Sequence, residues 1–323
     1  MTHPRVLVVG ASGFVGTAVV DALAQGGHLV ERMTAPRLSP LDAEGAEQFI
    51  RSAASVHELA RHFSGFDAVV NAAGNPNASE KDARALCAAN GVLPGLLAAA
   101  CAASTSSPRF VQVSSAVVQG HVQRLDDSTH TQPFSEYSRS KILGERLTSL
   151  FAPRNSVIYR PPSVHGEDRR VTRTLSRLAA SPLAFVARPG KRGSPQALVR
   201  NVGAAIAFLA TLPERPPPIV THPSEGLTTS SIMEVLGGRR PHEIPRWAAA
   251  AMTTTLLRLS GPLPALAANA RRIELVLFGQ EQALSWLTQA GFELPNGLPQ
   301  WQALGQAIRH QNSMRTSIGR SVQ

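Results

Sequence analysis

The sequence predicts an α/β protein with a doubly wound parallel sheet and a smaller, interleaved C-terminal region. Three observations predict this fold class. A glycine-rich turn joins an apolar run to a helical segment at the start of the chain. Short apolar runs then alternate with helical segments through residue 160, as in a parallel sheet covered by helices. Beyond residue 161 this alternation loosens, and 323 residues, 43% of them hydrophobic, suffice for about two domains.

The first element is the apolar run RVLVV at residues 5–9, which suits a buried strand, and helical composition follows over residues 17–25. Gly10, Gly13 and Gly16 lie between the two in the string GASGFVG. Glycines there permit a tight turn, close approach of the backbone to a pyrophosphate, and close packing of helix on strand. Because a helix start also offers free N–H groups to phosphates, the turn predicts a dinucleotide site.

The later elements follow in the same order. Each strand expected here is a short apolar run, and each helix is a longer segment rich in alanine, leucine and charged residues. Strands are expected within residues 26–37, 65–74, 108–120 and 155–163, and helices at 54–63, 82–104 and 136–151. We therefore expect residues 1–160 to form the dinucleotide-binding domain.

The C-terminal half is expected to be organised differently. It holds proline-rich pieces and few strand candidates, so residues 161–310 are expected to form mainly a substrate-binding region. Residues 197–212 read as the end of a strand, a turn and a helix that return to the first domain. The polar tail 311–323 lacks periodicity and is expected to be mobile.

Composition excludes several classes of protein. The net charge of +10 suits an anionic partner, but the arginines are spread along the chain and aromatic residues are few, so we expect no nucleic-acid binding. The histidines lack metal-ligand spacing and the two cysteines form no CxxC pair, so we expect neither a metal nor a disulfide. The apolar run near the start is too short for a signal peptide, which predicts a cytoplasmic location.

The segment 247–270 has Arg258 as its only charge. A membrane span needs about 20 continuous apolar residues, and this segment is interrupted by Arg258 and by a serine, a glycine and two prolines, so no span is expected. We expect an apolar helix lining a substrate cleft, with an interfacial membrane contact as the alternative.

Tyr137 and Lys141 stand four residues apart in YSRSK, which places a phenol and an ammonium on one helix face. The cation favours the phenolate, as general acid–base chemistry requires. The strand before this helix ends in the hydroxyls of Ser114 and Ser115. Because parallel strands present their carboxyl ends at one edge, the hydroxyls and the glycine turn should share a crevice.

Together these motifs resemble the extended branch of the short-chain dehydrogenase/reductase superfamily, which includes nucleotide-sugar epimerases, dehydratases and ketoreductases. The resemblance covers about the first 210 residues and rests on motifs in the family's order and spacing, namely GASGFVG, NAAG, AANGVLPGLLAA, VSSAVVQG, YSRSK and YRPPSVHG. It implies a Rossmann-type sheet and an enzyme that uses a nicotinamide dinucleotide.

The resemblance also assigns roles to residues. Tyr137 matches the catalytic acid–base, Lys141 its partner that also holds the nicotinamide ribose, and Ser115 the hydroxyl that binds the substrate oxygen. Asn90 matches an asparagine that supports a proton relay, with a purely structural helix residue as the alternative. The residues implied to line the coenzyme are Gly10, Ser12, Gly13, Phe14, Gly16, Ala72, Ala73, Lys141, Pro161 and Val164.

The end of the second strand bears on the choice of coenzyme. Members of the family that prefer NAD usually have Asp or Glu there, to hold the ribose 2′-hydroxyl. The position falls on Thr34 in this chain, with Arg32 and Arg37 nearby to accept a 2′-phosphate. The sequence therefore predicts NADP, with NAD as the alternative.

The two residues after Ser115 bear on which of the family's reactions the chain is expected to catalyse. The sugar dehydratases of this branch carry an Asp-Glu pair there, whereas this chain has Ala116 and Val117, which disfavours dehydration. We expect NADPH-dependent reduction of a keto group on an anionic nucleotide sugar. An NAD-dependent epimerase and a non-catalytic dinucleotide sensor are the alternatives, and a homodimer is left open. Asp126 and Asp127 are expected to be loop residues and not a catalytic pair.

Overall fold

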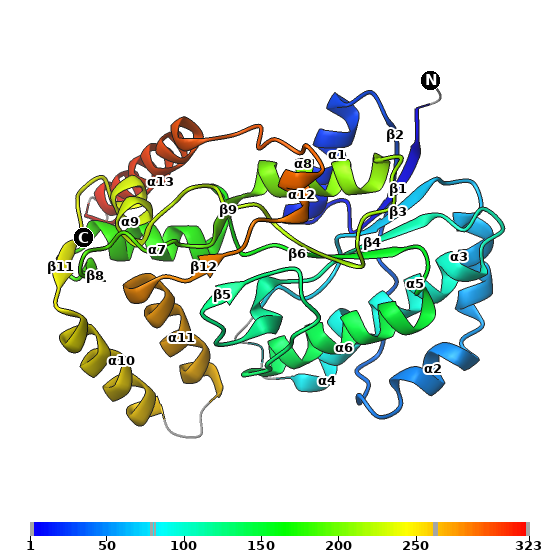
Figure 1. Cartoon of the computed structure of the whole chain (residues 1–323), viewed down its shortest axis with the longest axis horizontal. Coiled ribbons are helices and arrows are strands. Elements are labelled where there is room, and N and C mark those ends of the chain that lie inside the picture. The colour runs from blue at the N-terminus through cyan, green and yellow to red at the C-terminus, as the bar shows by residue number, and fades with distance from the viewer. Residues whose placement is uncertain (1–2, 78–79, 81, 261–263, 321–323) are drawn as a thin grey trace. The chain divides into compact units, whose positions relative to one another are not determined.

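The structure of the protein is a computed structural model that describes residues 3–77, 80, 82–260 and 264–320 (Figure 1). The chain divides into two compact units. Unit 1 comprises Met1–Pro162, Val199–Pro223 and Ala283–Glu293, and unit 2 comprises Ser163–Leu198, Ser224–Gln282 and Leu294–Gln323. Each unit is therefore built from three separate segments of the chain.

Unit 1 is built on a six-stranded sheet in the order β10-β6-β4-β3-β1-β2, in which every pair of neighbours is parallel. Its strands are β1 (Arg5–Val9), β2 (Leu29–Met33), β3 (Ala68–Asn71), β4 (Arg109–Val113), β6 (Ser156–Arg160) and β10 (Ile219–Thr221). In the register of the central strands, Val8 lies beside Val70, and Val69 lies beside Phe110. Because these residues are fully buried, both faces of the sheet are covered, as a parallel sheet requires. The predicted fold class is confirmed.

Two groups of helices cover this sheet (Figure 1). One group pairs α1 with α8, and the other packs α3, α5 and α6 together. Gly203 of α8 allows the first pairing, because a Cβ there would overlap the carbonyl oxygen of Ala18. The bounds of the elements are α1 (Phe14–Gln25), α2 (Ala46–Ser52), α3 (Ser55–Phe63), α4 (Ala83–Leu86), α5 (Leu93–Ala103), β5 (Arg124–Leu125), α6 (Glu136–Phe151), α8 (Val199–Thr211) and α12 (Trp286–Gln289).

The helical run over residues 83–103 is apolar and mostly buried. Among the described residues it alone has the length and composition to cross a membrane, and 78% of its most apolar window is buried, as in the core helix of a globular unit. It is not one regular α-helix as the sequence suggests, because a π-helical segment, η1 (Cys87–Val92), separates α4 from α5. Such π-bulges occur frequently at functional sites.

Unit 2 contains two short parallel strand pairs and five helices among its described residues. Strand β7 (Ser163–His165) pairs with β9 (Gln196–Leu198), and β8 (Phe185–Ala187) pairs with β11 (His242–Ile244). Its core contains Val186, Met233, Leu236 and Trp301. The remaining elements are α7 (Arg170–Ala180), α9 (Thr229–Gly237), α10 (Arg246–Ser260), α11 (Pro264–Phe278), β12 (Glu281–Gln282) and α13 (Leu298–Arg320).

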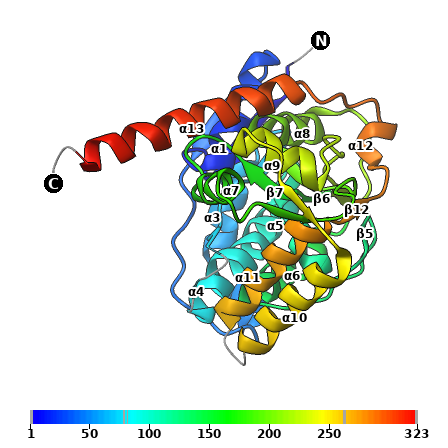
Figure 2. The same cartoon turned by 90° about the vertical axis from the view of Figure 1, so that its left-hand side faces the viewer.

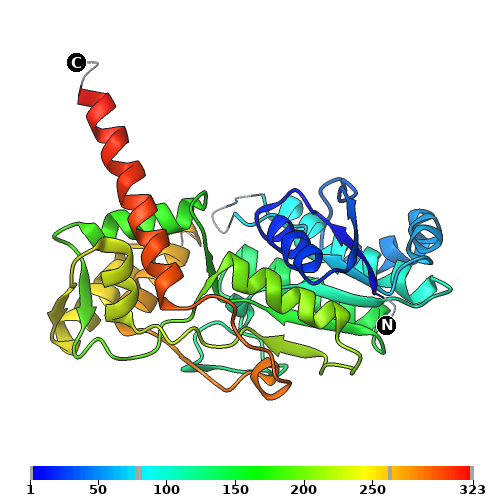
Figure 3. The same cartoon turned by 90° about the horizontal axis from the view of Figure 1, so that it is seen from above.

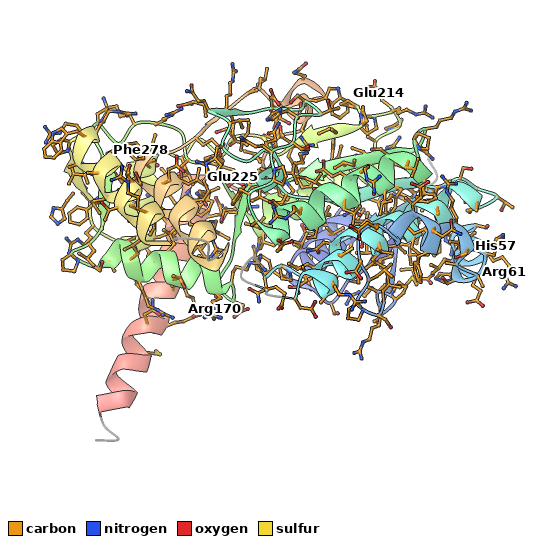
Figure 4. All side chains as sticks on the ribbon, turned by 90° about the horizontal axis from the view of Figure 1, so that it is seen from below. His57, Arg61, Arg170, Glu214, Glu225 and Phe278 are labelled. Atoms are coloured by element: carbon orange, nitrogen blue, oxygen red, sulfur yellow. The ribbon has the colours of Figure 1, made fainter. Side chains whose placement is uncertain are left out.

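Glu225 joins the three segments of unit 2 (Figure 4). One of its carboxylate oxygens accepts a hydrogen bond from Leu198 N at 3.0 Å, and the other accepts one from Trp301 Nε1 at 2.7 Å. Both of these residues are buried. The carboxylate therefore satisfies two buried donors from chain segments that lie far apart in the sequence.

Three local predictions differ from the structure. Helix α1 begins at Phe14, before residue 17, because the glycine turn itself enters the helix. The strand predicted within residues 108–120 ends at Val113, because Ser115 caps a 3₁₀ turn, η2 (Ala116–Gln119). The apolar AVV of that turn has the composition of a strand. Helix α13 extends through most of the tail 311–323, where the sequence shows no helical periodicity (Figure 3). Mobility of this tail stays a prediction.

Candidate active site

The glycine turn lies at the carboxyl end of β1, between β2 and β3, where the strand order reverses. Gly10 has φ +79°, and a Cβ there would lie 2.8 Å from the backbone of Ala73. A Cβ at Gly16 would overlap the carbonyl oxygen of Gly10. Gly10 thus permits a close approach to the loop that follows β3, and Gly16 permits close packing of α1 on the turn. Side chains at these positions would obstruct both contacts.

The N-terminus of α1 is open to an anion. Gly13 is its N-cap and has no side chain that could cap the helix, and no acidic residue lies in the first turn. Ser12 and Gly13 are exposed and Phe14 is half-buried. Backbone N–H groups at the positive end of a helix suit a pyrophosphate, so these residues fit a dinucleotide.

The end of β2 lies beside this turn, because Gly10 N donates a hydrogen bond to Met33 O at 2.9 Å. Thr34 follows directly and is exposed. Arg32 and Arg37 are also exposed, and their side chains form no hydrogen bond or ion pair with another described residue. Two guanidinium groups without a partner among the described residues therefore stand near Thr34, and the position itself is not acidic.

A buried amide pair shapes the loop after β3. Asn71 Nδ2 donates to Gln112 Oε1 at 2.8 Å, and Asn71 Oδ1 accepts from Ala73 N at 3.1 Å. Both amides are buried, and Ala72 and Ala73 are half-buried beside the glycine turn. Sequence reasoning missed Gln112, which stands inside a strand with no motif to mark it.

Lys141 is held in the interior of unit 1 by helix α6. A capping box between Ser135 and Ser138 fixes the start of this helix. The Lys141 ammonium is buried and donates to Val113 O, at the end of β4, at 3.3 Å. Burial lowers the pKa of Lys141 to about 8, and the carboxylate of Glu145 opposes this shift.

Asn90 lies in the π-helical segment and holds the loop after β3 against α6. Its Nδ2 donates to Asn75 O at 3.0 Å and to Ser140 Oγ at 3.2 Å, and its Oδ1 accepts from Asn75 N at 2.9 Å. A Cβ at Gly74 would lie 2.7 Å from Asn90 Oδ1 and 3.5 Å from Lys141 Nζ. Asn90 and Lys141 therefore converge on Gly74, and the bonds of Asn90 give it a structural function whether or not it also relays protons.

Tyr137 and Ser115 are both partly exposed at this edge of the sheet. Tyr137 lies in the first turn of α6, one turn before Lys141. Ser115 follows β4, and its Oγ accepts from Val117 N at 3.3 Å, which leaves its hydroxyl proton available. Ala116 N donates to Pro161 O at 2.9 Å and so joins the ends of β4 and β6.

Most of the predicted site residues therefore gather in unit 1, along the carboxyl edge of the sheet. Val164 is the exception, because it lies in β7 and belongs to unit 2. Asp126 and Asp127 hold loops, as expected. Asp126 accepts from Gln119 Nε2 at 2.8 Å, and Asp127 accepts from Thr221 N and Trp286 N at 2.6 and 3.0 Å.

A buried polar network behind the site escaped the sequence analysis. Ser114 Oγ donates to Glu145 Oε1 at 2.5 Å. Arg160 binds both oxygens of the same carboxylate, at 2.9 and 2.6 Å, and donates to Ser128 O at 2.7 Å. Glu145 stands one helical turn after Lys141 and Ser114 directly precedes Ser115. These two adjacencies are the only signals in the sequence that could have found the network.

Comparison with known proteins identifies the family. The profile of the NAD dependent epimerase/dehydratase family matches residues 6–189, more than half of the chain. The chain belongs to this family. The family predicted from the motifs is confirmed, and its description names the class of coenzyme that the glycine turn predicts.

Individual relatives agree with this assignment. A dTDP-4-dehydrorhamnose reductase of Mycolicibacterium smegmatis is 29% identical over 214 residues, which cover 64% of this chain and 60% of the relative. A dTDP-4-dehydrorhamnose reductase of Bacillus anthracis, solved with NADP, has a TM-score of 0.59 at 15% identity and covers 96% of this chain and 100% of its own. A UDP-glucuronic acid 4-epimerase of Bacillus cereus, solved with NAD, has a TM-score of 0.60 at 16% identity over 95% and 99%. The chain thus spans 60% of the curated relative's length. The two solved structures share the fold of this chain.

Proposed function

We propose that the protein is an NADPH-dependent ketoreductase whose substrate is a keto group on a nucleotide-linked sugar. One observation carries the proposal. Tyr137 and Lys141 occupy successive turns of α6, with the Lys141 ammonium buried against the end of β4, the strand that Ser115 follows. This is the arrangement of a phenol, a cation and a hydroxyl that carbonyl reduction needs.

The coenzyme would be held by parts of unit 1 that suit it. The uncapped start of α1 fits the pyrophosphate, and the close approach of Gly10 to Ala73 keeps the turn free of side chains. The Lys141 ammonium is the donor proposed for the nicotinamide ribose. Bound there, NADPH supplies the hydride for the carbonyl carbon.

Residues of the chain polarise the carbonyl oxygen and then protonate it. Ser115 and Tyr137 donate hydrogen bonds to it, so the oxygen is polarised before it acquires charge. Tyr137 then gives up its proton to form the alcohol, and the Lys141 ammonium stabilises the tyrosinate that remains. Asn90 reconnects this site to water, so that the lost proton is replaced.

The preference for NADPH is proposed from the end of β2. Arg32 and Arg37 are free to pair with a 2′-phosphate, and no acidic side chain stands at Thr34 to repel it. The preference for reduction over dehydration is proposed from Ala116 and Val117, which stand where dehydratases of this branch carry their acid and base.

The substrate class is proposed from the relatives and from charge. The M. smegmatis relative is named a reductase of a dTDP-linked keto sugar, and the net charge of +10 suits an anionic substrate. We further propose that the enzyme acts in the cytoplasm.

The test is a steady-state assay of the purified protein with nucleotide-linked 4-keto sugars and either NADPH or NADH. The proposal predicts oxidation of NADPH in step with formation of alcohol. Interconversion of two sugar epimers without net consumption of coenzyme would replace the reductase with an epimerase, and binding of NADPH without any turnover would favour a sensor.

A further inference from the structure

Unit 2 carries almost all of the protein's net positive charge. It holds 16 lysines and arginines but only 7 aspartates and glutamates, a net charge of +9. Unit 1 holds 16 and 15 of them, a net charge of +1. The basic residues are thus shared evenly, and the imbalance arises because acidic residues are scarce in unit 2. A surface that attracts anions is therefore a property of this unit.

Helices α10 and α11 form an antiparallel pair within unit 2 (Figure 2). The inner side of the pair is packed, because Ala249, Ile273 and Leu277 belong to one apolar cluster with Ala187 of β8. Arg246 lies over the ring of Phe278 at 5.6 Å, which ties the start of α10 to the end of α11 (Figure 4). The described residues of this inner side thus anchor the pair to the unit.

The outer side of α10 is apolar and exposed. Trp247 is 76% exposed and Met252 is 40% exposed, although both are large hydrophobic residues. The exposed positions between and after them are alanine and threonine, namely Ala250, Ala251, Thr254 and Thr255. Arg258 is exposed at the far end of the helix. Exposed Trp247 and Met252 beside alanines and threonines on one helix face mark a surface that meets another molecule.

Through residue 273 the charges on this pair of helices are all positive, and Glu274 near the end of α11 is the one acidic residue in the two helices. Residues 245–273 contain no aspartate or glutamate, and their four charges are Arg246, Arg258, Arg271 and Arg272. Of these, Arg271 is paired with Glu274 at 2.8 Å. An apolar face with a tryptophan and a basic border is the pattern of an element that lies in the headgroup region of a membrane.

We propose that the outer face of α10 docks on a lipid surface with anionic headgroups. Trp247 enters the interface between headgroups and acyl chains, Met252 and the alanines lie against it, and Arg258 pairs with lipid phosphates. The net charge of unit 2 draws the protein to the surface and the apolar face holds it there. Nucleic acid fits less well, because an apolar face of alanine and methionine offers nothing to a phosphate backbone. This contact lies wholly in unit 2 and does not depend on the proposed reaction.

The experiment is flotation of the full-length protein with vesicles of phosphatidylcholine alone and of phosphatidylcholine mixed with phosphatidylglycerol. We expect flotation with the anionic vesicles only, release at high salt, and a blue shift of tryptophan emission on binding. Trp247→Ala should abolish the blue shift and weaken binding, and Arg258→Gln should weaken binding roughly fivefold, as expected for one charge near an anionic surface.

Matched controls come from unit 1. Phe49→Ala removes an aromatic side chain that is 38% exposed, and Arg61→Gln removes an exposed helix arginine (Figure 4). Both variants should bind anionic vesicles as the wild type does, and unchanged thermal unfolding of all four variants would show that the fold is kept. Equal flotation with neutral vesicles, wild-type binding by Trp247→Ala, or capture of a DNA fragment without any vesicle binding would each overturn the proposal.

Discussion

Ser114 Oγ donates a hydrogen bond of 2.5 Å to Glu145 Oε1, and Arg160 donates to both oxygens of the same carboxylate. Ser114 precedes Ser115 in the chain, and Glu145 follows Lys141 by one helical turn. A single buried carboxylate therefore fixes the end of β4, which carries one proposed catalytic residue, against α6, which carries two others. It also supplies a negative charge close to Lys141.

The first prediction concerns the charge of Glu145. Burial holds the pKa of Lys141 at about 8, and Glu145 opposes that shift by favouring the ammonium. Because reduction needs the ammonium, kcat/KM should fall as pH rises through about 8. Glu145→Gln removes the favourable charge, so the pKa of Lys141 should fall further and this limb of the profile should move to lower pH.

The same substitution leaves Arg160 buried without its carboxylate, which costs about 3 to 5 kcal/mol in typical cases. The pH profile separates the two effects, because loss of stability alone lowers the amount of active enzyme at every pH. Glu47→Gln is the matched control, since Glu47 forms an exposed ion pair with Arg51 on α2. A limb that stays in place in Glu145→Gln, measured on folded protein, would refute the electrostatic role.

The second prediction separates the three proposed catalytic groups. Ser115→Ala should lower kcat by about 10²-fold to 10³-fold with little change in NADPH affinity, as is typical when one oxyanion partner is lost. Tyr137→Phe should abolish turnover and leave NADPH binding intact, because only the hydroxyl is removed. Lys141→Met should lower both turnover and NADPH binding, because Lys141 is proposed to act on the tyrosine and on the nicotinamide ribose. Near-normal turnover by Tyr137→Phe in stopped or continuous assays would rule out its acid–base role.

The fold and part of this site could be predicted because their signals are local. The glycine turn places three glycines within seven residues of one strand, and Tyr137 and Lys141 stand one turn apart on one face of one helix. Each pattern has a physical meaning that needs no knowledge of the rest of the chain. Ser115 could be found because the carboxyl ends of parallel strands share one edge.

The network around Glu145 could not be predicted, because its members are joined only by folding. Glu145 and Arg160 stand 15 residues apart on a helix and a strand, and Ser114 comes from a third element. Read along the chain, Glu145 resembles any charged residue on an exposed helix face. The π-helical segment that positions Asn90 was equally hidden, since its composition is that of an ordinary α-helix.

The third prediction tests the choice of coenzyme. Arg32→Ala and Arg37→Ala should weaken NADPH binding and leave NADH binding almost unchanged, because only NADPH carries a 2′-phosphate. Thr34→Asp should shift the preference toward NADH, since a carboxylate repels that phosphate and can hold a 2′-hydroxyl. Titration by nicotinamide fluorescence measures both affinities. Wild-type protein that binds NADH as tightly as NADPH would contradict the assignment.

The fourth prediction concerns the acid stability of unit 2. His165 is fully buried, with its ring nitrogens within 3.1 Å of Thr172 Oγ1 and 2.6 Å of Gln196 Oε1, and burial lowers its pKa to about 4. Between pH 6.5 and about 4 the unfolded chain binds a proton that the folded chain does not, so stability should fall as pH falls through this window. The expected loss is about 3 kcal/mol from this group.

Urea unfolding at pH 7 and pH 4.5 measures this loss, followed by tryptophan fluorescence, to which Trp301 beside the His165 ring contributes. Other titrating groups act alike in the wild type and in His165→Gln, so the comparison isolates the histidine. The variant should be less stable than the wild type at pH 7, but its free energy of unfolding should fall less between pH 7 and pH 4.5. An equal loss in both proteins would show that His165 does not titrate as described.

The central claim is transfer of hydride from NADPH to a keto carbon, and isotope transfer tests it most directly. NADPH deuterated at both C4 positions of the nicotinamide is incubated with the protein and a nucleotide-linked 4-keto sugar, and the product is analysed by mass spectrometry and NMR. The account predicts one deuterium per molecule of product, bonded to the new alcohol carbon, with one NADPH oxidised for each. An alcohol without deuterium at that carbon, or an epimerised sugar with the NADPH unchanged, would contradict it.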